Sequence, residues 1–241
     1  MKKVLITGAN KSIGFETARQ LLKKGYFVYL GSRDVAKGEQ AVAQLKQEGL
    51  DQVELLQIDV SNPASVEAAG KKITELDVLI NNAGILGGMG QSALTTDLAT
   101  LQEVYNTNFF GVINVTQTFI EVLKKSAEPR IVNVTSGLGS LTLHSDPDWK
   151  YYQVKTAAYG TSKTALNAYT VVLAFELKDT AFKVNAVDPG YTQTDFNHHN
   201  GPGKVEDAAG IVVKYATLGA DGPTGKFFSQ DMDTADQESP W

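Results

Sequence analysis

Seven short apolar segments alternate along the chain with longer segments in which apolar residues recur at helical spacing. Within the short segments most positions are apolar in succession rather than at every second residue, which is typical of strands buried on both faces of a parallel sheet. The longer segments 12–25 and 35–49 end in glycine, a common residue at helix C-termini. The apolar segments are residues 3–7, 26–30, 53–58, 77–80, 130–135, 182–187 and 225–228.

Strand and helix patterns alternate from one end of the chain to the other, so the sequence predicts the α/β class. We expect a doubly wound, Rossmann-type parallel sheet of about seven strands with helices on both faces. No Pro/Ser-rich linker, block of charge or internal repeat divides the 241 residues. The chain is therefore expected to fold as a single domain.

The composition narrows the classes of function. A formal net charge of −5 argues against a protein that binds the phosphate backbone of nucleic acids, because such a protein needs a basic surface. Residues 1–10 lack the apolar run of a signal peptide and no segment has transmembrane length, so we expect a cytoplasmic protein without a membrane partner. The chain has no cysteine, which excludes disulfides and thiolate chemistry.

The histidines do not form a metal-binding pattern. The chain has 3 of them, His144, His198 and His199. The adjacent pair points in different directions in any regular element, and the third is distant in sequence. We expect no metal site.

A glycine-containing turn follows the first predicted strand. In VLITGANKSIG the chain leaves the strand, turns at Gly8 and enters a helix between Ser12 and Gly14. Glycine allows the backbone to approach a pyrophosphate closely, and a helix N-terminus offers free N–H groups and a favourable dipole. The spacing is TGxxxSxG rather than GxGxxG, with Ser12 at the place of a second glycine. The turn favours a dinucleotide site, although a tight turn without a ligand would have the same pattern.

Five further motifs occur in order along the chain: NNAG at 81–84, NTNFFG at 106–111, NVTSG at 133–137, YGTSK at 159–163 and DPGYTQT at 188–194. Together with the glycine turn they resemble the classical short-chain dehydrogenase/reductase family over residues 3–228. Within the family, TGANKSIG, SRD and GPTGKFFS look most similar to the monomeric carbonyl reductases. The resemblance implies that residues 1–135 form mainly the dinucleotide-binding half. Residues 136–241 would carry the catalytic helix, the substrate loops and a C-terminal tail.

Two Tyr-x-x-x-Lys pairs compete for the catalytic position. Tyr159 and Lys163 begin a long segment of apolar periodicity, whereas Tyr151 and Lys155 lie in a polar stretch. The separation of Tyr151 from Ser136 is nearer to the usual family spacing. The resemblance nevertheless selects Tyr159, with an insertion of roughly ten residues before it, because loops tolerate added length at little cost.

The resemblance assigns a catalytic set of Asn108, Ser136, Tyr159 and Lys163. Tyr159 and Lys163 are four residues apart on one helix face, so the ammonium is expected to lower the tyrosine pKa from about 10 toward the range of a working acid or base. Tyr159 would protonate the carbonyl oxygen during hydride transfer, and Ser136 would hydrogen-bond the same oxygen. Lys163 would bind the nicotinamide ribose, and Asn108 would hold a water that supplies protons to Lys163.

The cofactor contacts are also implied by the resemblance. Asp59 follows the third strand, where a carboxylate of the family meets the adenine; its alternative role is to cap the next helix. Ser32 stands where NAD-specific members carry an aspartate, and together with Arg33 and Lys11 it favours NADP(H) over NAD(H), which is the alternative. Asp34 is expected to begin the next helix. The implied cofactor-binding residues are Gly8, Asn10, Lys11, Ser12, Ile13, Gly14, Ser32, Arg33, Asp59, Val60, Asn82, Ala83, Gly84, Tyr159, Lys163, Pro189, Gly190, Thr192 and Thr194.

Aromatic residues gather in two variable segments around the predicted site. We expect an apolar substrate pocket formed by Trp149, Tyr152, Tyr191 and Phe196, although covering the edge of the core is the competing role for each. The C-terminal tail, residues 231–241, is either loose, folded back over the pocket or in contact with a partner subunit. The sequence does not decide between a monomer and a dimer or tetramer.

The predicted function is the NADPH-dependent reduction of small-molecule ketones or aldehydes to alcohols. A 3-oxoacyl-thioester, polyol or steroid dehydrogenase of the same family would share every motif. A regulator that senses dinucleotides without catalysis is disfavoured, because such relatives typically lose the Tyr–Lys pair that this chain keeps.

Overall fold

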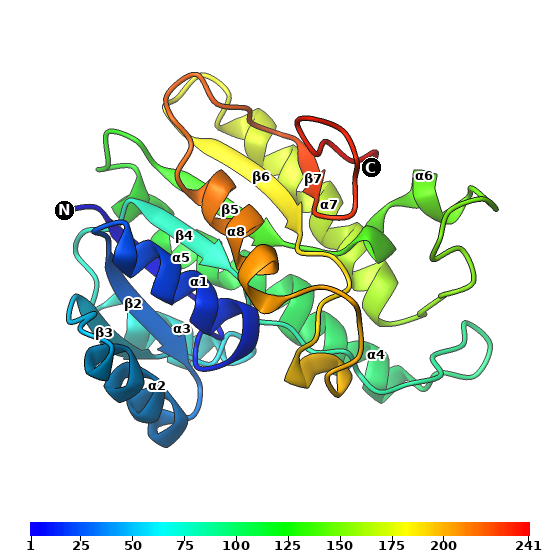
Figure 1. Ribbon diagram of the computed structural model, residues 1–241, viewed down its shortest axis with the longest axis horizontal. Helices are drawn as coiled ribbons and strands as arrows, with labels where there is room; N and C mark the ends of the chain where they lie inside the picture. The colour runs from blue at the N-terminus through cyan, green and yellow to red at the C-terminus, as the bar shows by residue number, and fades with distance from the viewer.

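The strands of the protein form one sheet, seen in a computed structural model that describes residues 1–241 (Figure 1). The spatial order is β3-β2-β1-β4-β5-β6-β7, and all neighbouring strands are parallel. The prediction of a doubly wound, seven-stranded sheet in a single domain is confirmed. The strands are β1 (Lys3–Ile6), β2 (Phe27–Ser32), β3 (Val53–Gln57), β4 (Val78–Asn81), β5 (Arg130–Val134), β6 (Lys183–Asp188) and β7 (Phe227–Ser229).

Helices cover both faces of the sheet: α1, α2 and α8 pack on one face, and α3, α5 and α7 pack on the other. None of the helices combines the length and apolarity that crossing a bilayer would require. The helical segments are α1 (Ser12–Lys23), α2 (Val35–Gln47), α3 (Pro63–Gly70), α4 (Leu98–Tyr105), η1 (Asn106–Phe110), α5 (Gly111–Leu123), η2 (Gly137–Gly139), α6 (Leu141–His144), α7 (Tyr159–Glu176), η3 (Asp195–Asn197) and α8 (Val205–Ala216).

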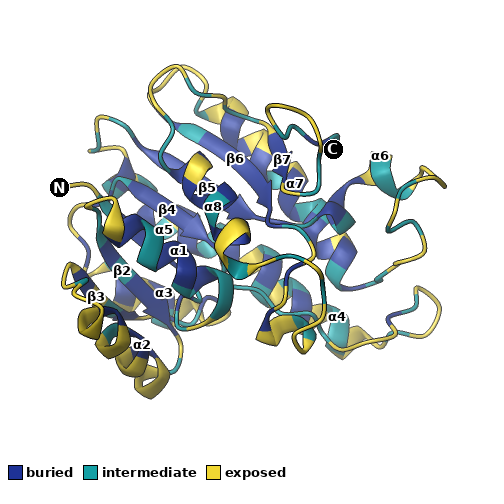
Figure 2. Cartoon of the chain, viewed as in Figure 1, coloured by how far each residue is buried: buried dark blue, intermediate teal, exposed yellow.

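The two faces of the sheet belong to two separate apolar clusters. Val4 and Ile6 of β1 point into the cluster under α1 and α8, whereas Leu5 between them points into the cluster under α5. Successive strand residues alternate between faces, so a strand covered on both sides is apolar at each position. Figure 2 shows the result, with buried strands at the centre and exposed residues on the outer sides of the helices.

The strand order reverses between β1 and β4. From β1 the chain adds β2 and β3 on one side, then returns to place β4 to β7 on the other. The loops that leave β1 and β4 therefore separate to opposite faces and open a crevice at the carboxyl ends of these strands, the usual ligand position in such folds.

Buried amides connect the two central strands with the helices behind them. Asn81 ends β4 and lies beside Asn133 of β5, whose Oδ1 accepts a 2.9 Å hydrogen bond from Asn81 Nδ2. Asn133 Nδ2 donates in turn to Thr170 Oγ1 of α7 at 2.9 Å, and Asn81 Nδ2 also reaches Thr116 Oγ1 of α5 at 3.2 Å. These bonds fix α5 and α7 along the sheet, because buried polar groups are costly to leave unpaired.

The C-terminal tail folds back along the outer edge of β7. Ser229 N donates to Gln237 O at 2.9 Å, and Ser239 N donates to Phe227 O at 2.8 Å. The Trp241 ring stacks on Phe227 with ring centres 5.6 Å apart. The tail is thus not loose: it folds back on the chain, but along β7 rather than over the pocket as the sequence analysis considered (Figure 1).

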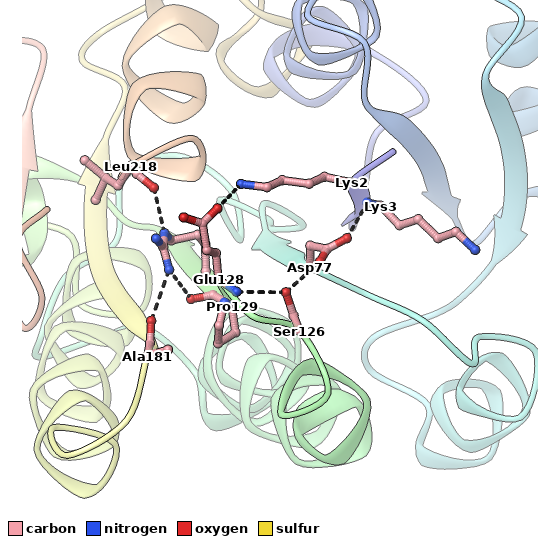
Figure 3. A network of polar contacts seen from close by, with 9 residues as sticks. Lys2, Lys3, Asp77, Ser126, Glu128, Pro129, Ala181 and Leu218 are labelled. Carbon is pink, nitrogen blue, oxygen red and sulfur yellow. Dashed lines mark hydrogen bonds and ion pairs between the residues drawn. The ribbon is translucent and has the colours of Figure 1, made fainter. Parts of the chain in front are cut away.

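A buried arginine joins three segments at the opposite, amino edge of the sheet; its partners Pro129, Ala181 and Leu218 are labelled in Figure 3. Arg130 begins β5 and is 2% exposed. Its Nε donates to Leu218 O at 2.9 Å, and its Nη1 donates to Pro129 O at 2.9 Å and to Ala181 O at 3.1 Å. The side chain therefore holds the ends of α7 and α8 against the start of β5.

Replacing Arg130 with methionine keeps an apolar stem of similar length and removes the donors. We expect Arg130→Met to lower the free energy of unfolding by about 2–4 kcal/mol, because three carbonyl groups lose a charged partner. Urea denaturation measures the change. Lys2→Ala, which removes an exposed ion pair with Glu128, is the matched control and should change stability by less than about 1 kcal/mol. Equal stability of Arg130→Met and the wild type would contradict the assigned role.

Candidate active site

The predicted catalytic residues lie on three segments that meet at the carboxyl edge of the sheet. Asn108 belongs to η1, a π-helical turn between α4 and α5, and Ser136 follows β5. Tyr159 is the first residue of α7, and Lys163 lies one turn further along the same helix. The structure brings all four together, since Asn108 Nδ2 donates to Ser162 Oγ of α7 at 3.1 Å and the Ser136 hydroxyl hydrogen-bonds Tyr159.

The competing tyrosine pair does not share a helix face. Residues 151–155 form turns outside α7, so the four-residue spacing of Tyr151 and Lys155 has no helical meaning there. Lys155 Nζ contacts His144 instead, 3.0 Å from its Nδ1 and 2.8 Å from its main-chain oxygen. Of the two pairs, only Tyr159 and Lys163 have the geometry that the predicted chemistry needs.

Lys163 is buried beneath the tyrosine. The residue is only 4% exposed. Its Nζ donates to Val134 O at 2.8 Å and lies 5.7 Å from the centre of the Tyr159 ring. Burial lowers the pKa of Lys163 to about 8, against an opposing contribution from the negative charge of Asp188. The lysine is therefore an ammonium that releases its proton far more readily than an exposed lysine.

The pKa of Tyr159 differs in direction from our expectation. Burial raises the pKa of Tyr159 above its ordinary value, and the charge of Asp188 raises it further, whereas the hydrogen bond with Ser136 lowers it. Removing the phenolate from water costs more than the hydrogen bond recovers. The expectation that Lys163 brings a net fall in the tyrosine pKa is not met in this structure.

Asp188 is a site residue that the sequence reasoning missed. It ends β6, is 5% exposed, and accepts hydrogen bonds from Ser229 Oγ at 2.7 Å and Gly190 N at 3.0 Å. Burial raises the pKa of Asp188, partly offset by these two donors. The available signal was an acidic residue directly after a buried apolar strand and before a Pro-Gly turn.

Both amide protons of Asn108 are engaged with protein groups. Its Nδ2 donates to Ile85 O at 2.9 Å in addition to Ser162, and its Oδ1 accepts from Ile85 N at 2.8 Å. Asn108 thus ties the loop after β4 to α7. Because the side-chain amide has no free donor, a water could bind this side chain only by donating to the second acceptor position of Oδ1.

The glycine turn packs directly on the NNAG segment. Gly8 has a φ of 64°, and a Cβ there would lie 3.0 Å from Cα of Ala83. A Cβ on Gly14 would lie 2.5 Å from Nδ2 of Asn82, which donates to Gly8 O at 3.1 Å. A side chain at either position would be too close to Ala83 or Asn82, so the packing of the two segments itself requires glycine at both positions. The neighbouring predicted contacts lie exposed or half-buried along the turn: Asn10, Lys11, Ser12 and Ile13.

Ser32, the last residue of β2, is buried, whereas Arg33, which follows it, is exposed. Ser32 is 1% exposed and its hydroxyl donates to Asp34 O at 2.8 Å, so it is already engaged rather than free for a phosphate. Asp34 caps α2 by accepting from Lys37 N at 3.1 Å, as expected. Arg33 is exposed and forms no salt bridge, so its guanidinium is available to a ligand.

An acidic residue from η3 lies over the start of α1. Asp195 Oδ2 accepts a 2.9 Å hydrogen bond from Ser12 Oγ and lies 3.7 Å from Lys11 Nζ. These contacts lower the pKa of Asp195, the Ser12 bond most. Lys11, expected to face a 2′-phosphate, is thus paired within the protein in this conformation.

The loop after β3 contains the predicted adenine contact. Asp59 accepts hydrogen bonds from both the N–H and the hydroxyl of Ser61, at 3.0 and 2.7 Å. The cap of α3 is Asn62, whose Oδ1 accepts from Ala64 N at 3.1 Å, so the alternative capping role of Asp59 is not the one adopted. Val60 beside it is buried.

The turn after β6 is ordered by its own backbone. Gly190 has a φ of 76°, in the left-handed region that glycine favours, and Thr192 Oγ1 donates to Pro189 O at 3.2 Å. Thr192 and Thr194 are both buried. The turn leads directly into η3, and so the predicted nicotinamide contacts and the loop over the glycine turn form one continuous segment.

Aromatic rings of the two variable segments contact one another near the candidate site. The Phe196 ring lies 5.4 Å from the Tyr159 ring, and Trp149 lies 3.3 Å from the position that a Cβ on Gly137 would take. Tyr151 links Trp149 and Tyr191, with ring centres 5.4 and 6.1 Å away. The Tyr152 ring faces Lys155 Nζ at 4.1 Å and takes no part in these ring contacts.

Known proteins share both the sequence pattern and the fold. The family model described as short chain dehydrogenase matches residues 2–204. A (+)-neomenthol dehydrogenase of Arabidopsis thaliana is 35% identical over 94% of this chain and 95% of its own length. The solved structure of salutaridine reductase from Papaver somniferum superposes with a TM-score of 0.83 and 32% identity, covering 95% of this chain and 100% of the other.

A second solved structure, an NADPH-bound carbonyl reductase from chicken fatty liver, has a TM-score of 0.84 at 27% identity and covers 100% of this chain and 99% of the other. The matched family model spans well over half of the chain, and the relatives align along nearly their whole lengths. The chain belongs to the short-chain dehydrogenase family and is an oxidoreductase of that family.

Proposed function

We propose that the protein reduces ketones or aldehydes to alcohols with NADPH. The observation that carries the proposal is the position of Tyr159 at the start of α7, beside Ser136 and one turn before Lys163. The relatives described above are named as a dehydrogenase and reductases, and one solved structure is a carbonyl reductase with NADPH bound. These names support the same class of reaction and the same cofactor.

The carboxyl edge of the sheet has the features that a dinucleotide requires. α1 has no side-chain cap, so its first N–H groups are available to a phosphate. Gly8 and Gly14 keep the turn close to Asn82 and Ala83. A phosphate at the start of α1 would replace Asp195 as the partner of Ser12 and Lys11. When bound, NADPH would supply the hydride, with Lys163 holding its nicotinamide ribose.

Tyr159 is protonated at neutral pH, as the reducing direction requires. The raised pKa also makes the phenol a weaker acid, so donation of its proton to the carbonyl oxygen depends on stabilisation of the phenolate that forms. Ser136 orients the same oxygen. With a pKa of about 8, Lys163 is largely protonated at pH 7, and its charge would stabilise the phenolate that remains.

Removing the Tyr159 hydroxyl tests the assignment. Tyr159→Phe should lower kcat by at least ~10²-fold, the scale of positioned acid–base catalysis, while the dissociation constant of NADPH changes little because the ring remains. Oxidation of NADPH with a panel of ketones and aldehydes measures turnover. Tyr151→Phe is the matched control and should keep its activity. Loss of turnover in Tyr151→Phe with full activity in Tyr159→Phe would overturn the assignment.

The preference for NADPH rests on Arg33. Its guanidinium is exposed and unpaired at the carboxyl end of β2, and the nearby acid Asp34 is occupied in capping α2. No acidic side chain stands at position 32, where it would repel a 2′-phosphate. A planar guanidinium binds phosphate with charge-assisted hydrogen bonds.

Arg33→Ala should lower kcat/KM with NADPH by roughly 10- to 100-fold, the value of one charge-assisted contact, and leave kcat/KM with NADH nearly unchanged. Lys37→Ala removes the same charge from the exposed side of α2 and serves as the control. Steady-state kinetics with both cofactors decide the outcome. A wild type that prefers NADH, or equal losses in the two variants, would contradict the cofactor assignment.

The substrate would lie against Trp149 and Phe196. Phe196 covers the Tyr159 ring, and Trp149 lies over Gly137, the residue after Ser136. Both rings therefore border the position of the reacting carbonyl. Tyr152 turns away toward Lys155, so we no longer place it in the pocket.

Trp149→Ala should raise KM for ketones with a large apolar substituent by roughly tenfold, because an aromatic contact contributes about 0.5–1.5 kcal/mol beyond its buried area. Tyr152→Ala, on the same insertion, should leave KM unchanged. The comparison uses a series of ketones of increasing size, with melting temperatures measured in parallel. Equal KM values for both variants across the series would refute the proposed wall.

A further inference from the structure

The first two N–H groups of the helix that carries Tyr159, those of Ala158 and Tyr159, have no side-chain acceptor from neighbouring residues in the sequence. The N-cap residue of the helix is Ala158, which offers no side-chain acceptor. The first N–H groups of a helix have no partner within the helix, and leaving them unpaired in a buried place is costly. A residue far away in the chain supplies the acceptor here: Gln91 Oε1 accepts from Ala158 N at 2.9 Å and from Tyr159 N at 2.8 Å.

The other end of the same amide holds the loop after β4. Gln91 Nε2 donates to Leu86 O at 2.6 Å and to Gly88 O at 3.1 Å. A side-chain amide has two donors and an oxygen with two acceptor positions, so every hydrogen-bonding position of Gln91 is used. The residue is 9% exposed, so water competes little for these bonds.

The loop has the backbone that this arrangement needs. Gly87, Gly88 and Gly90 all have positive φ values, of 78°, 88° and 73°, which turn the chain back and bring Gln91 under α7. Ile85, one residue before Leu86, is fixed as well, because Asn108 binds both its N–H and its carbonyl. The segment from Ile85 to Gly88 and the start of α7 therefore form one hydrogen-bonded unit.

We infer that Gln91 is a positioning residue that fixes the backbone of Tyr159 relative to the loop after β4. The inference rests on the proposed function, in which Tyr159 donates the proton and Asn82, Ala83 and Gly84, which begin the loop, are predicted cofactor contacts. Tyr159 is the first helical residue, so its backbone is the least constrained of α7 and gains most from an outside acceptor. A misplacement of about 1 Å of a catalytic group can cost ~10²-fold in rate.

If Gln91 only stabilised the helix, its loss would have a different consequence from the loss of a residue that positions Tyr159. Thr156 Oγ1 accepts from Gly160 N at 2.9 Å, so it binds the next N–H of the same helix without touching Tyr159 N. If Gln91 only stabilised the helix, loss of either acceptor would have the same consequence. Thr156→Ala is therefore the matched control for Gln91→Leu.

Gln91→Leu should lower kcat by roughly 10- to 100-fold while KM for ketone and NADPH stays within about threefold, since the binding surfaces are retained. Thr156→Ala should keep kcat within about threefold at a similar loss of melting temperature. Amide hydrogen exchange, which needs no substrate, should be faster at Ala158 and Tyr159 in Gln91→Leu. Unchanged exchange there, or equal loss of kcat in the two variants, would overturn the inference.

Gln91→Glu covers the case in which the leucine variant fails to fold. It keeps an acceptor of the same length at the helix N-terminus, where a negative charge is favourable, and it removes the two donors that hold Leu86 O and Gly88 O. The charged groups that face Tyr159 are Asp188 of β6 and Lys163 of α7. The added charge has the same sign as that of Asp188 and the opposite sign to that of Lys163. The pH at which kcat falls should therefore move upward, because the phenolate becomes less favourable.

An unshifted pH profile in Gln91→Glu would overturn the inference. The wild type and Tyr159→Phe, measured in the same assay, separate the two proposals. A wild type without turnover refutes the proposed function, and the exchange measurement then still decides whether Gln91 orders the start of α7. An active wild type with an active Gln91→Leu refutes the positioning role alone.

Discussion

All strands of the sheet run in the same direction, and the rest of the structure depends on this constraint. Parallel strands place their carboxyl ends at one edge, so the loops after β1, β4, β5 and β6 meet there although they are far apart in sequence. Parallel strands also need helical returns, and these cover both faces of the sheet. The sheet thereby becomes a rigid support whose one open edge collects the candidate catalytic side chains, while Arg130 closes the opposite edge.

The sequence predicted those features that depend on local pattern. The strands, the glycine turn and the Tyr159 helix follow from residues near one another in the chain. What it did not predict depends on tertiary contacts. The burial of Asp188 depends on Ser229 of β7, the cap of α7 on Gln91, and the direction of Tyr152 on Lys155. The raised pKa of Tyr159 was missed for the same reason, because spacing on a helix reveals a charge partner but not the desolvation that outweighs it.

Burial acts in opposite directions on the two titratable groups of α7. It disfavours the phenolate of Tyr159 and the ammonium of Lys163, since each is the charged form of its group. The pair is therefore pushed toward neutrality. Asp188 adds to the effect on the tyrosine and opposes it on the lysine, which keeps a positive charge available beneath the phenol.

The C-terminal tail connects the sheet edge to the substrate wall. An uncovered edge strand presents unpaired N–H and carbonyl groups, and the tail satisfies those of β7 by pairing along it. The same tail reaches the insertion at two points: Ser140 Oγ donates to Pro240 O at 2.8 Å, and Lys150 Nζ lies 3.1 Å from Asp231. Trp149 lies between these two anchors in the sequence. The insertion that carries Trp149 is thus held in part by the end of the chain, so changes in the tail are expected to alter substrate binding before they alter the core.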